Sequence, residues 1–190
     1  IHGIANVEPY PRLRGTANRR KTCRLTLVVM PTIVCPVARS LRREIKQMKS
    51  FDSIEEEVFL NLQRTAESLL GSLAEVLKVF DLTPTQYNVL RILRGAGPAG
   101  LPCREVSERM VTRDPDVTRL LDRLEARALV ERERLTSDRR VVQARITLGG
   151  TEVLATADPA VNRFLLEAMC TMDRTELAAL RTALEKLREK

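Results

Sequence analysis

Residues 114–142 read DPDVTRLLDRLEARALVERERLTSDRRVV, and this stretch decides the fold that we predict for the chain. Its first part repeats apolar residues at intervals of three or four, namely Val117, Leu120, Leu121 and Leu124. That spacing places apolar side chains on one face of an α-helix. The opposite face carries Arg119, Asp122, Arg123 and Arg127. The stretch therefore predicts a short amphipathic helix with an arginine-bearing outer face.

A second short helix is expected just before this one, over residues 101–110, packed by Val106 and Met110. Asp114 is the expected N-cap of the arginine-bearing helix, and Pro115 its first helical residue. Two short helices joined by a tight turn form a helix-turn-helix when the second has a polar outer face. The second helix of such a motif fits the major groove of DNA.

A two-stranded ribbon should follow directly, because residues 129–134 and 141–147 alternate between apolar and polar side chains with the period of a strand. The polar turn between the strands contains Asp138, Arg139 and Arg140. Arginines at a hairpin tip suit phosphate contacts or insertion into a narrow minor groove. We therefore predict a winged helix-turn-helix over residues 82–147, mainly α with a small β-wing, that binds double-stranded DNA.

The helix that opens this part has a clear start signal. Thr83 is placed to be its N-cap, Pro84 its first residue, and Gln86 the partner that closes a capping box. The helix is expected to end before the glycine-rich residues 95–100, which lack the spacing of a phosphate-binding loop.

Two apolar helical patterns flank the winged part, over residues 53–80 and 148–190. In the second pattern, Thr147 is a candidate cap, Pro159 should kink the helix or begin a new segment, and Asp173 should cap the last helix. Each stripe fits either an intrachain core or a subunit interface. Together the two stripes carry more apolar surface than a small winged module needs to bury. We therefore expect them to be the N- and C-terminal dimerisation helices of a homodimer.

Positive charge is concentrated near the N-terminus. The chain holds 32 Lys and Arg against 25 Asp and Glu, but residues 1–47 account for 10 basic and 2 acidic side chains, leaving 22 and 23 for residues 48–190. Residues 101–147 carry 11 arginines, no lysine and 9 acids. Net charge is therefore no evidence of DNA binding here, and any positive surface must come from the arrangement of arginines.

Histidine and cysteine are too sparse for most enzyme chemistry. The single histidine is His2, and the four cysteines, at 23, 35, 103 and 170, form no C-x-x-C pair. The sequence thus lacks a histidine-based zinc site and a histidine general base. We expect no catalysis, no metal and no required cofactor. The cysteine usage fits a reducing compartment, which favours a cytoplasmic location.

Residues 1–47 differ from the rest in containing four prolines and a basic run at residues 19–21. The apolar residues 25–38 follow that run and permit a signal peptide as an alternative, although two prolines interrupt them and they are too short to span a membrane. The chain begins with Ile1, and Met48 precedes the first well-patterned helix. We expect residues 1–47 to be a disordered extension or a misassigned start, with Met48 as the initiator and residues 48–190 as the folded domain.

The order of these elements, and the amino-acid sequences of several of them, resemble the MarR family of bacterial transcription regulators over about residues 52–188. The resemblance rests on LTPTQYNVL at 82–90, VTRLLDRLE at 117–125, LVER at 129–132 and DRR at 138–140. It implies a winged helix-turn-helix homodimer whose recognition helix enters the major groove while Arg140 approaches the minor groove. It also implies a cleft between the dimerisation and DNA-binding parts that takes a small aromatic or phenolic effector.

The sequence departs from the family pattern at two places. Ala128 stands where the family commonly has the glycine that ends the recognition helix. A left-handed alanine there costs about 1 kcal/mol, and the alternative is a helix end that is built differently. Cys103 stands where a capping Ser or Thr is expected. The first helix lacks the cysteine of the peroxide-sensing branch, so whether Cys103 or Cys170 senses oxidants is left open.

The candidate DNA-binding residues lie on the recognition helix, in the turn before it and in the wing. They are Thr112, Arg113, Asp116, Thr118, Arg119, Arg123, Arg139 and Arg140, with Asp138 orienting a wing arginine. Arg119 and Arg123 are expected to reach guanine edges or phosphates. The alternative for these two arginines is a solvated helix face, balanced by Asp116 and Asp122.

Together these patterns and the resemblance predict a repressor that binds a pseudo-palindromic operator as a homodimer, and the resemblance implies that it responds to a ligand. The alternative is a helical dimeric interaction module whose winged fold contacts another protein.

Overall fold

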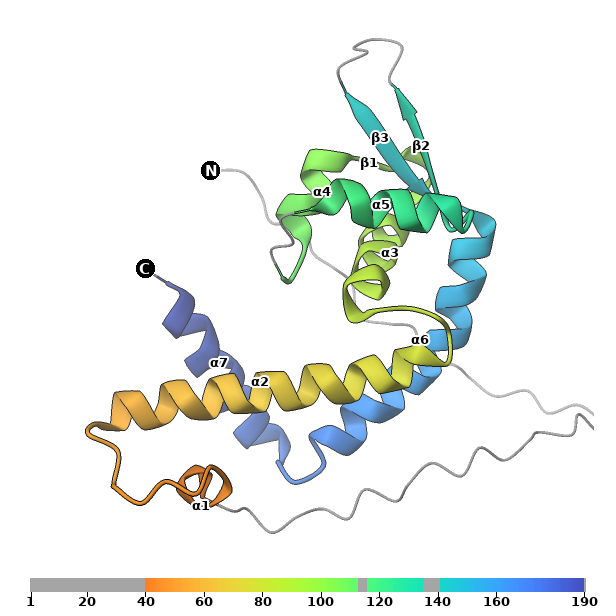
Figure 1. The fold of residues 1–190 in the computed structure, drawn as a ribbon. Coiled ribbons are helices and arrows are strands. Elements are labelled where there is room, and N and C mark those ends of the chain that lie inside the picture. Colours follow the sequence, from red (N-terminus) through yellow and green to blue (C-terminus); the bar gives the residue numbers. More distant parts are fainter. Residues whose placement is uncertain (1–39, 113–115, 135–140, 190) are drawn as a thin grey trace, which may run out of the picture. The chain divides into compact units, whose positions relative to one another are not determined.

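The computed structural model describes residues 40–112, 116–134 and 141–189 (Figure 1). In chain order the elements are α1 (Leu41–Glu44), α2 (Ile54–Lys78), α3 (Pro84–Ala96), the 3-10 turn η1 (Gly97–Ala99), β1 (Leu101–Pro102), α4 (Cys103–Arg109), α5 (Val117–Ala126), β2 (Val130–Arg134), β3 (Val142–Ile146), α6 (Leu148–Ala168) and α7 (Arg174–Arg188). The predicted fold class, mainly α with a small β-wing, is confirmed. None of the helices in the described ranges is long and apolar enough to cross a membrane.

Helix α3 begins where its capping signal predicts. The Thr83 hydroxyl accepts a hydrogen bond from the Gln86 backbone N–H at 3.2 Å, and the Gln86 side-chain oxygen accepts one from the Thr83 N–H at 2.9 Å. Pro84 is the first helical residue. The helix runs through Gly95 to Ala96, two residues beyond the predicted end, because a glycine in the last turn weakens a helix without preventing it.

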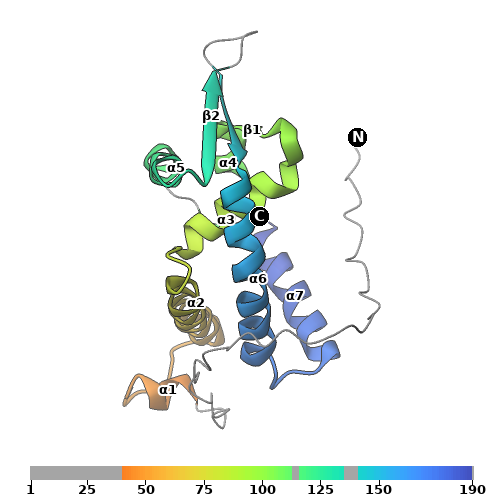
Figure 2. The same cartoon turned by 90° about the vertical axis from the view of Figure 1, so that its right-hand side faces the viewer.

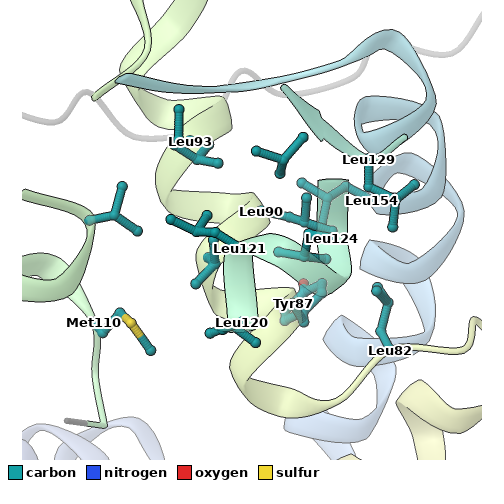
Figure 3. Close-up of a cluster of buried hydrophobic side chains, with 14 of the residues drawn as sticks. Leu82, Tyr87, Leu90, Leu93, Met110, Leu120, Leu121, Leu124, Leu129 and Leu154 are labelled. Carbon is teal, nitrogen blue, oxygen red and sulfur yellow. The ribbon is translucent and has the colours of Figure 1, made fainter. Parts of the chain in front are cut away.

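The core is built around α3, whose Val89, Leu90 and Leu93 are fully buried. Figure 3 shows Leu90 and Leu93 among side chains from α5 and α6. The buried partners that come from these other elements are Leu77 of α2, Leu121 and Leu124 of α5, and Leu154 of α6. Helix α3 thus joins the recognition helix to both long flanking helices.

The sheet has three antiparallel strands in the order β1-β3-β2. Val130 of β2 pairs with Ile146 of β3, and the register continues to Arg134 opposite Val142. These two strands match the predicted ribbon. Strand β1 was not predicted: Leu101 was expected to begin a helix, but it pairs with Ala144 instead, and α4 starts at Cys103. A two-residue strand is too short to produce an alternating pattern.

The recognition helix α5 starts later than the sequence suggested. Its N-cap is Asp116, whose side chain accepts a hydrogen bond from the Arg119 N–H at 3.1 Å, and not Asp114. Asp114 and Pro115 lie outside the described residues. Both aspartates have a capping side chain, and the pattern placed the helix start two residues too early.

Pro159 does not begin a new segment, because α6 continues from Leu148 to Ala168 with the proline inside it. Figure 1 shows α6 changing direction along its course, the outcome expected where a proline removes one hydrogen bond. Thr147 caps this helix by accepting from the Gly150 N–H at 3.0 Å, and Asp173 with Glu176 forms the predicted capping box of α7.

The prediction for residues 1–47 falls mostly on residues 1–39, which lie outside the described residues. Residues 40–47 contain the short helix α1, in which Leu41 is buried. Helix α1 contacts α2, and the Arg64 guanidinium lies 4.0 Å from a Glu44 carboxylate oxygen. The structure therefore places α1 against the first of the long flanking helices.

Ala128 adopts the left-handed conformation, with φ 53°, so the helix ends as the family's glycine position implies and not in a different way. Its N–H donates to the Glu125 carbonyl at 2.8 Å, and the Leu129 N–H donates to the Leu124 carbonyl at 3.0 Å. These two bonds form the Schellman motif that usually carries glycine at this position. The Ala128 carbonyl accepts from the Thr147 hydroxyl at 2.7 Å, so the turn also supports the start of α6.

Ala128→Gly is expected to raise the free energy of unfolding by about 1 kcal/mol, because glycine adopts a positive φ without steric cost. Urea and thermal unfolding at matched protein concentration measure the change. The control is Ala155→Gly, at an exposed position inside α6, which is expected to destabilise by roughly 1 kcal/mol. Destabilisation by both substitutions would contradict the left-handed turn at residue 128.

Candidate nucleic-acid interface

The exposed face of α5 presents the side chains that the sequence selected for DNA contact. Thr118, Arg119 and Arg123 are exposed, whereas Leu121 and Leu124 on the opposite face are fully buried. The helix is therefore fixed by its apolar side and offers its polar side to a partner. Thr112, in the turn before the helix, is also exposed, and Arg113 lies outside the described residues.

Asp116 and Arg119 are linked at the start of this face. Besides capping the helix, the Asp116 carboxylate lies 2.9 Å from the Arg119 guanidinium, and 77% of the Arg119 side-chain surface is exposed. An exposed ion pair of this kind is weak and exchanges readily with a phosphate or a base edge. The structure thus gives Asp116 a capping and orienting position, and its predicted DNA contact stays a prediction.

Strands β2 and β3 extend away from the helices, with α5 beside their base (Figure 1 and Figure 2). Glu133 and Arg145 form a cross-strand ion pair at 3.2 Å on this ribbon. The predicted wing residues Asp138, Arg139 and Arg140 lie outside the described residues. The strands on either side of them, β2 and β3, form where the sequence predicted, directly after the recognition helix.

Arg132 of β2 is a functional candidate that the sequence reasoning missed. Its guanidinium donates to Glu125 at 2.6 and 3.0 Å and to Asp122, and its backbone N–H donates to Glu125 at 3.1 Å. Hydrogen bonding to Glu125 is the main reason that the pKa of Arg132 is raised, while partial burial opposes it. A signal was present: Arg132 is two residues from buried Val130, so alternation places both on the side of β2 that faces α5.

A second polar cluster ties α3 to α6. The Tyr87 hydroxyl donates to one Asp158 carboxylate oxygen at 2.7 Å, and the Arg94 guanidinium donates to the other at 2.7 Å. Burial, followed by the hydrogen bond and the charge of Asp158, raises the pKa of Tyr87 to about 12. Tyr87 therefore belongs to the core and anchors α3 to the flanking helix α6.

Cys103 and Cys170 are free cysteines in the described part of the chain. Burial raises the pKa of the Cys103 thiol, which lowers the thiolate fraction that oxidants attack. Cys170 is exposed at the end of α6. Within the described ranges no group of histidine, cysteine or acidic side chains is arranged to hold a metal ion.

A groove of about 620 Å³ lies where the end of α2, the start of α3 and the end of α5 meet. Its lining includes Lys78, Asp81, Pro84, Gln86, Arg123 and Arg127. The Arg127 guanidinium lies 3.1 Å from the Asp81 carboxylate and also donates to the Asp81 backbone carbonyl. The groove thus adjoins a contact that joins the end of the recognition helix to the corner between α2 and α3.

These elements define a winged helix-turn-helix DNA-binding protein. The model of the MarR family matches residues 82–142, from the start of α3 into β3. A transcriptional repressor of Bacillus subtilis, MdtR, is 34% identical over 122 residues, which are 62% of this chain and 77% of the relative. The chain belongs to the MarR family.

Solved structures agree with this assignment. A MarR transcription factor from Planctomyces limnophilus is 34% identical with a TM-score of 0.57, and the match covers 72% of this chain and 98% of the other. A cysteine-to-serine mutant of Escherichia coli MarR in complex with operator DNA is 25% identical with a TM-score of 0.64, covering 79% and 99%. The chain is thus similar to MarR proteins over nearly their whole length.

Tyr87→Phe is expected to lower the free energy of unfolding by about 1 kcal/mol at neutral pH, because it removes a buried hydrogen bond. The folded pKa of about 12 lies above the ordinary 10.0, so the stability from Tyr87 is complete below pH 10 and is lost as the pH rises towards 12. Urea unfolding across this range should show a smaller alkaline loss in the variant. An identical loss in both proteins would contradict the role given to the Tyr87 hydroxyl.

Proposed function

We propose that the protein is a homodimeric transcription repressor that reads a pseudo-palindromic DNA site with two copies of α5 and two wings. The observation that carries this proposal is the face of α5, where Arg119 and Arg123 are exposed beside the base of the β2–β3 ribbon. A helix fixed in this way presents its side chains to the major groove while the wing reaches the neighbouring backbone or minor groove. No catalytic step is needed, and contact with the bacterial chromosome would place the protein in the cytoplasm.

The flanking helices support the proposed dimer. Helix α7 has no buried residue within the described part of the chain, and large apolar side chains are exposed along α2, α6 and α7. They are Ile54, Val58, Phe59, Leu70, Leu148, Leu165, Leu166, Leu180 and Leu187. Apolar faces of this extent mark a protein interface. With residues 53–80 and 148–190 as dimerisation helices, a second copy of the chain would cover them.

Within the winged helix-turn-helix part, we assign base contacts to Arg119 and Arg123, because both are exposed on α5. Thr112, Arg113 and Thr118 would contact phosphates at the start of the helix. Arg139 and Arg140 would do so at the wing, with Asp138 orienting them, since a carboxylate is repelled by phosphate.

The groove at the junction of α2, α3 and α5 is our proposed site for a small aromatic or phenolic effector. Two proteins of the same fold support the effector class. One, at 18% identity, is an organohalide-sensing regulator bound to 2,4-dichlorophenol, and the other, at 21% identity, is Bordetella bronchiseptica BpsR, regulated by 6-hydroxynicotinic acid. An effector next to Arg123 and Arg127 would change the position of α5 and lower DNA affinity.

Arg119→Ala is expected to weaken binding to a duplex that the wild-type protein selects from a random-sequence library, and to relax discrimination at one base position by about 1–3 kcal/mol. Arg140→Ala should weaken binding to all duplexes, with some loss of A/T preference. Fluorescence anisotropy with single-base variants of the duplex measures both effects. Equal, sequence-blind losses from the two variants would contradict the assignment of α5 as the recognition helix.

The rival function, a protein-interaction module, is distinguished by salt. Phosphate neutralisation makes the affinity for the selected duplex fall steeply as salt rises from low to moderate concentration. Binding that is absent, or insensitive to salt, would favour the rival.

Leu166→Asp is expected to dissociate the dimer, because it places a charge on a side chain that is 76% exposed in the single chain and would be covered in the dimer. Sedimentation velocity measures the oligomeric state. Val111→Asp, at a side chain that is 88% exposed in the turn after α4, is the control and should remain dimeric. A monomeric wild-type protein, or a dimer unaffected by Leu166→Asp, would contradict the proposed interface.

A further inference from the structure

We propose that Arg132 is a positioning residue for DNA binding, which fixes α5 to the wing and offsets part of the negative charge of two carboxylates on the same side of the recognition helix. This inference rests on the proposed function. It adds a residue outside the predicted set of DNA contacts and gives it a role that differs from theirs.

The geometry supports a fixed position for Arg132 rather than a mobile surface arginine. Both Glu125 carboxylate oxygens are engaged, one by the Arg132 backbone N–H at 3.1 Å and the other by the guanidinium at 2.6 and 3.0 Å. The same guanidinium reaches Asp122, one helical turn earlier. Only 20% of the Arg132 side-chain surface is exposed. Multiple arginine–carboxylate bonds of this kind set orientation as well as distance.

The contact joins the two elements that would touch DNA. Asp122 and Glu125 lie on α5, and Arg132 lies on β2, whose far end leads to the wing turn. Two acceptors one turn apart, held by one guanidinium, resist rotation of α5 about its own axis. A change in the tilt of the recognition helix would therefore also move the wing.

Arg132 also acts through its positive charge. Asp122 and Glu125 have 51% and 38% of their side-chain surface exposed, on a helix that must approach phosphates. Without Arg132 these carboxylates would oppose the attraction that Arg119 and Arg123 exert. With Arg132 bound to both, the net charge of the cluster falls from −2 to −1, so the local repulsion is reduced before DNA arrives.

A different role for Arg132 would be a direct phosphate contact, in which the acids compete with DNA for the guanidinium. The two roles differ in what the acids do. If Arg132 positions α5, removing the acids while Arg132 is present also weakens the link between α5 and β2, and this loss offsets the gain from removing negative charge. When Arg132 is already absent, only the gain remains, and removing the acids strengthens binding. If Arg132 binds phosphate, removing the acids frees it and strengthens binding of the otherwise wild-type protein.

The test is a double-mutant cycle on affinity for the duplex selected by the wild-type protein. Its members are wild type, Arg132→Gln, the pair Asp122→Asn with Glu125→Gln, and the triple variant. We expect Arg132→Gln to weaken binding about tenfold, the acid pair alone to change it little, and the triple variant to recover most of the loss. Circular dichroism and thermal unfolding check that each variant is folded. If Arg132→Gln alone unfolds, the triple variant still allows the test, because it keeps a neutral, hydrogen-bonding cluster at this place.

The matched control is Arg145→Gln on the adjacent strand β3. Arg145 pairs with Glu133 at 3.2 Å, so this change removes the same charge from the same ribbon, but the Arg145 side-chain bonds run to β2 and Ala99 rather than to α5. It should weaken binding less than Arg132→Gln, and adding the acid pair should not rescue it.

The outcomes separate the two proposals. Absence of salt-dependent duplex binding by the wild-type protein would overturn the proposed function and this inference together. If the wild-type protein binds the duplex, but the acid-pair substitutions change its affinity equally in the presence and absence of Arg132, the inference alone is overturned. Stronger binding by the acid pair, with a steeper salt dependence, would assign Arg132 to a phosphate contact and also overturn it.

Discussion

The packing of one apolar face of α5 against α3 is the constraint on which the rest of the structure depends. Helix α5 has only 10 residues, too few to be stable alone in water. Its position comes from Leu121 and Leu124, which are fully buried in a core that also holds Leu90 and Leu93 of α3 (Figure 3). Because this face is fixed, the opposite face is presented to solvent in one orientation, and Arg119 and Arg123 are carried with it.

Polar contacts then fix the two ends of the recognition helix. At its start Asp116 caps the backbone and holds Arg119. Near its end Arg132 binds α5 to β2, while Arg127 binds Asp81 at the corner between α2 and α3. The helix is therefore connected to the wing on one side and to the first long helix on the other. A perturbation at the α2–α3 corner has a short physical route to the proposed DNA-binding face, through Arg127.

Much of the fold was predictable because local signals agreed with tertiary packing. The capping box at Thr83 and Gln86, the box at Asp173, and the alternating strands 129–134 and 141–147 each predicted an element that the structure contains. The left-handed position of Ala128 was one of two alternatives that the family resemblance raised, and the structure decides for it. These features depend on residues within a few positions of one another.

The features that sequence reasoning missed depend on distant partners. Strand β1 exists because Leu101 pairs with Ala144, which lies far along the chain, and two residues carry no period. The start of α5 required a choice between two aspartates with equal capping chemistry. Arg132 was passed over because only the packing of α5 on β2 brings it to Glu125 and Asp122. The wing arginines lie outside the described residues, so their assignment to DNA remains a prediction.

Two α5 helices, held by the dimer, should enter successive major grooves on one face of the duplex. Methylation interference at guanine N7 tests this most directly, since that atom lies in the major groove. Interference is expected in two symmetric clusters about 10 base pairs apart, and Arg119→Ala should weaken it at one guanine position in each cluster. A single cluster, or interference confined to minor-groove adenines, would contradict the placement of the two recognition helices.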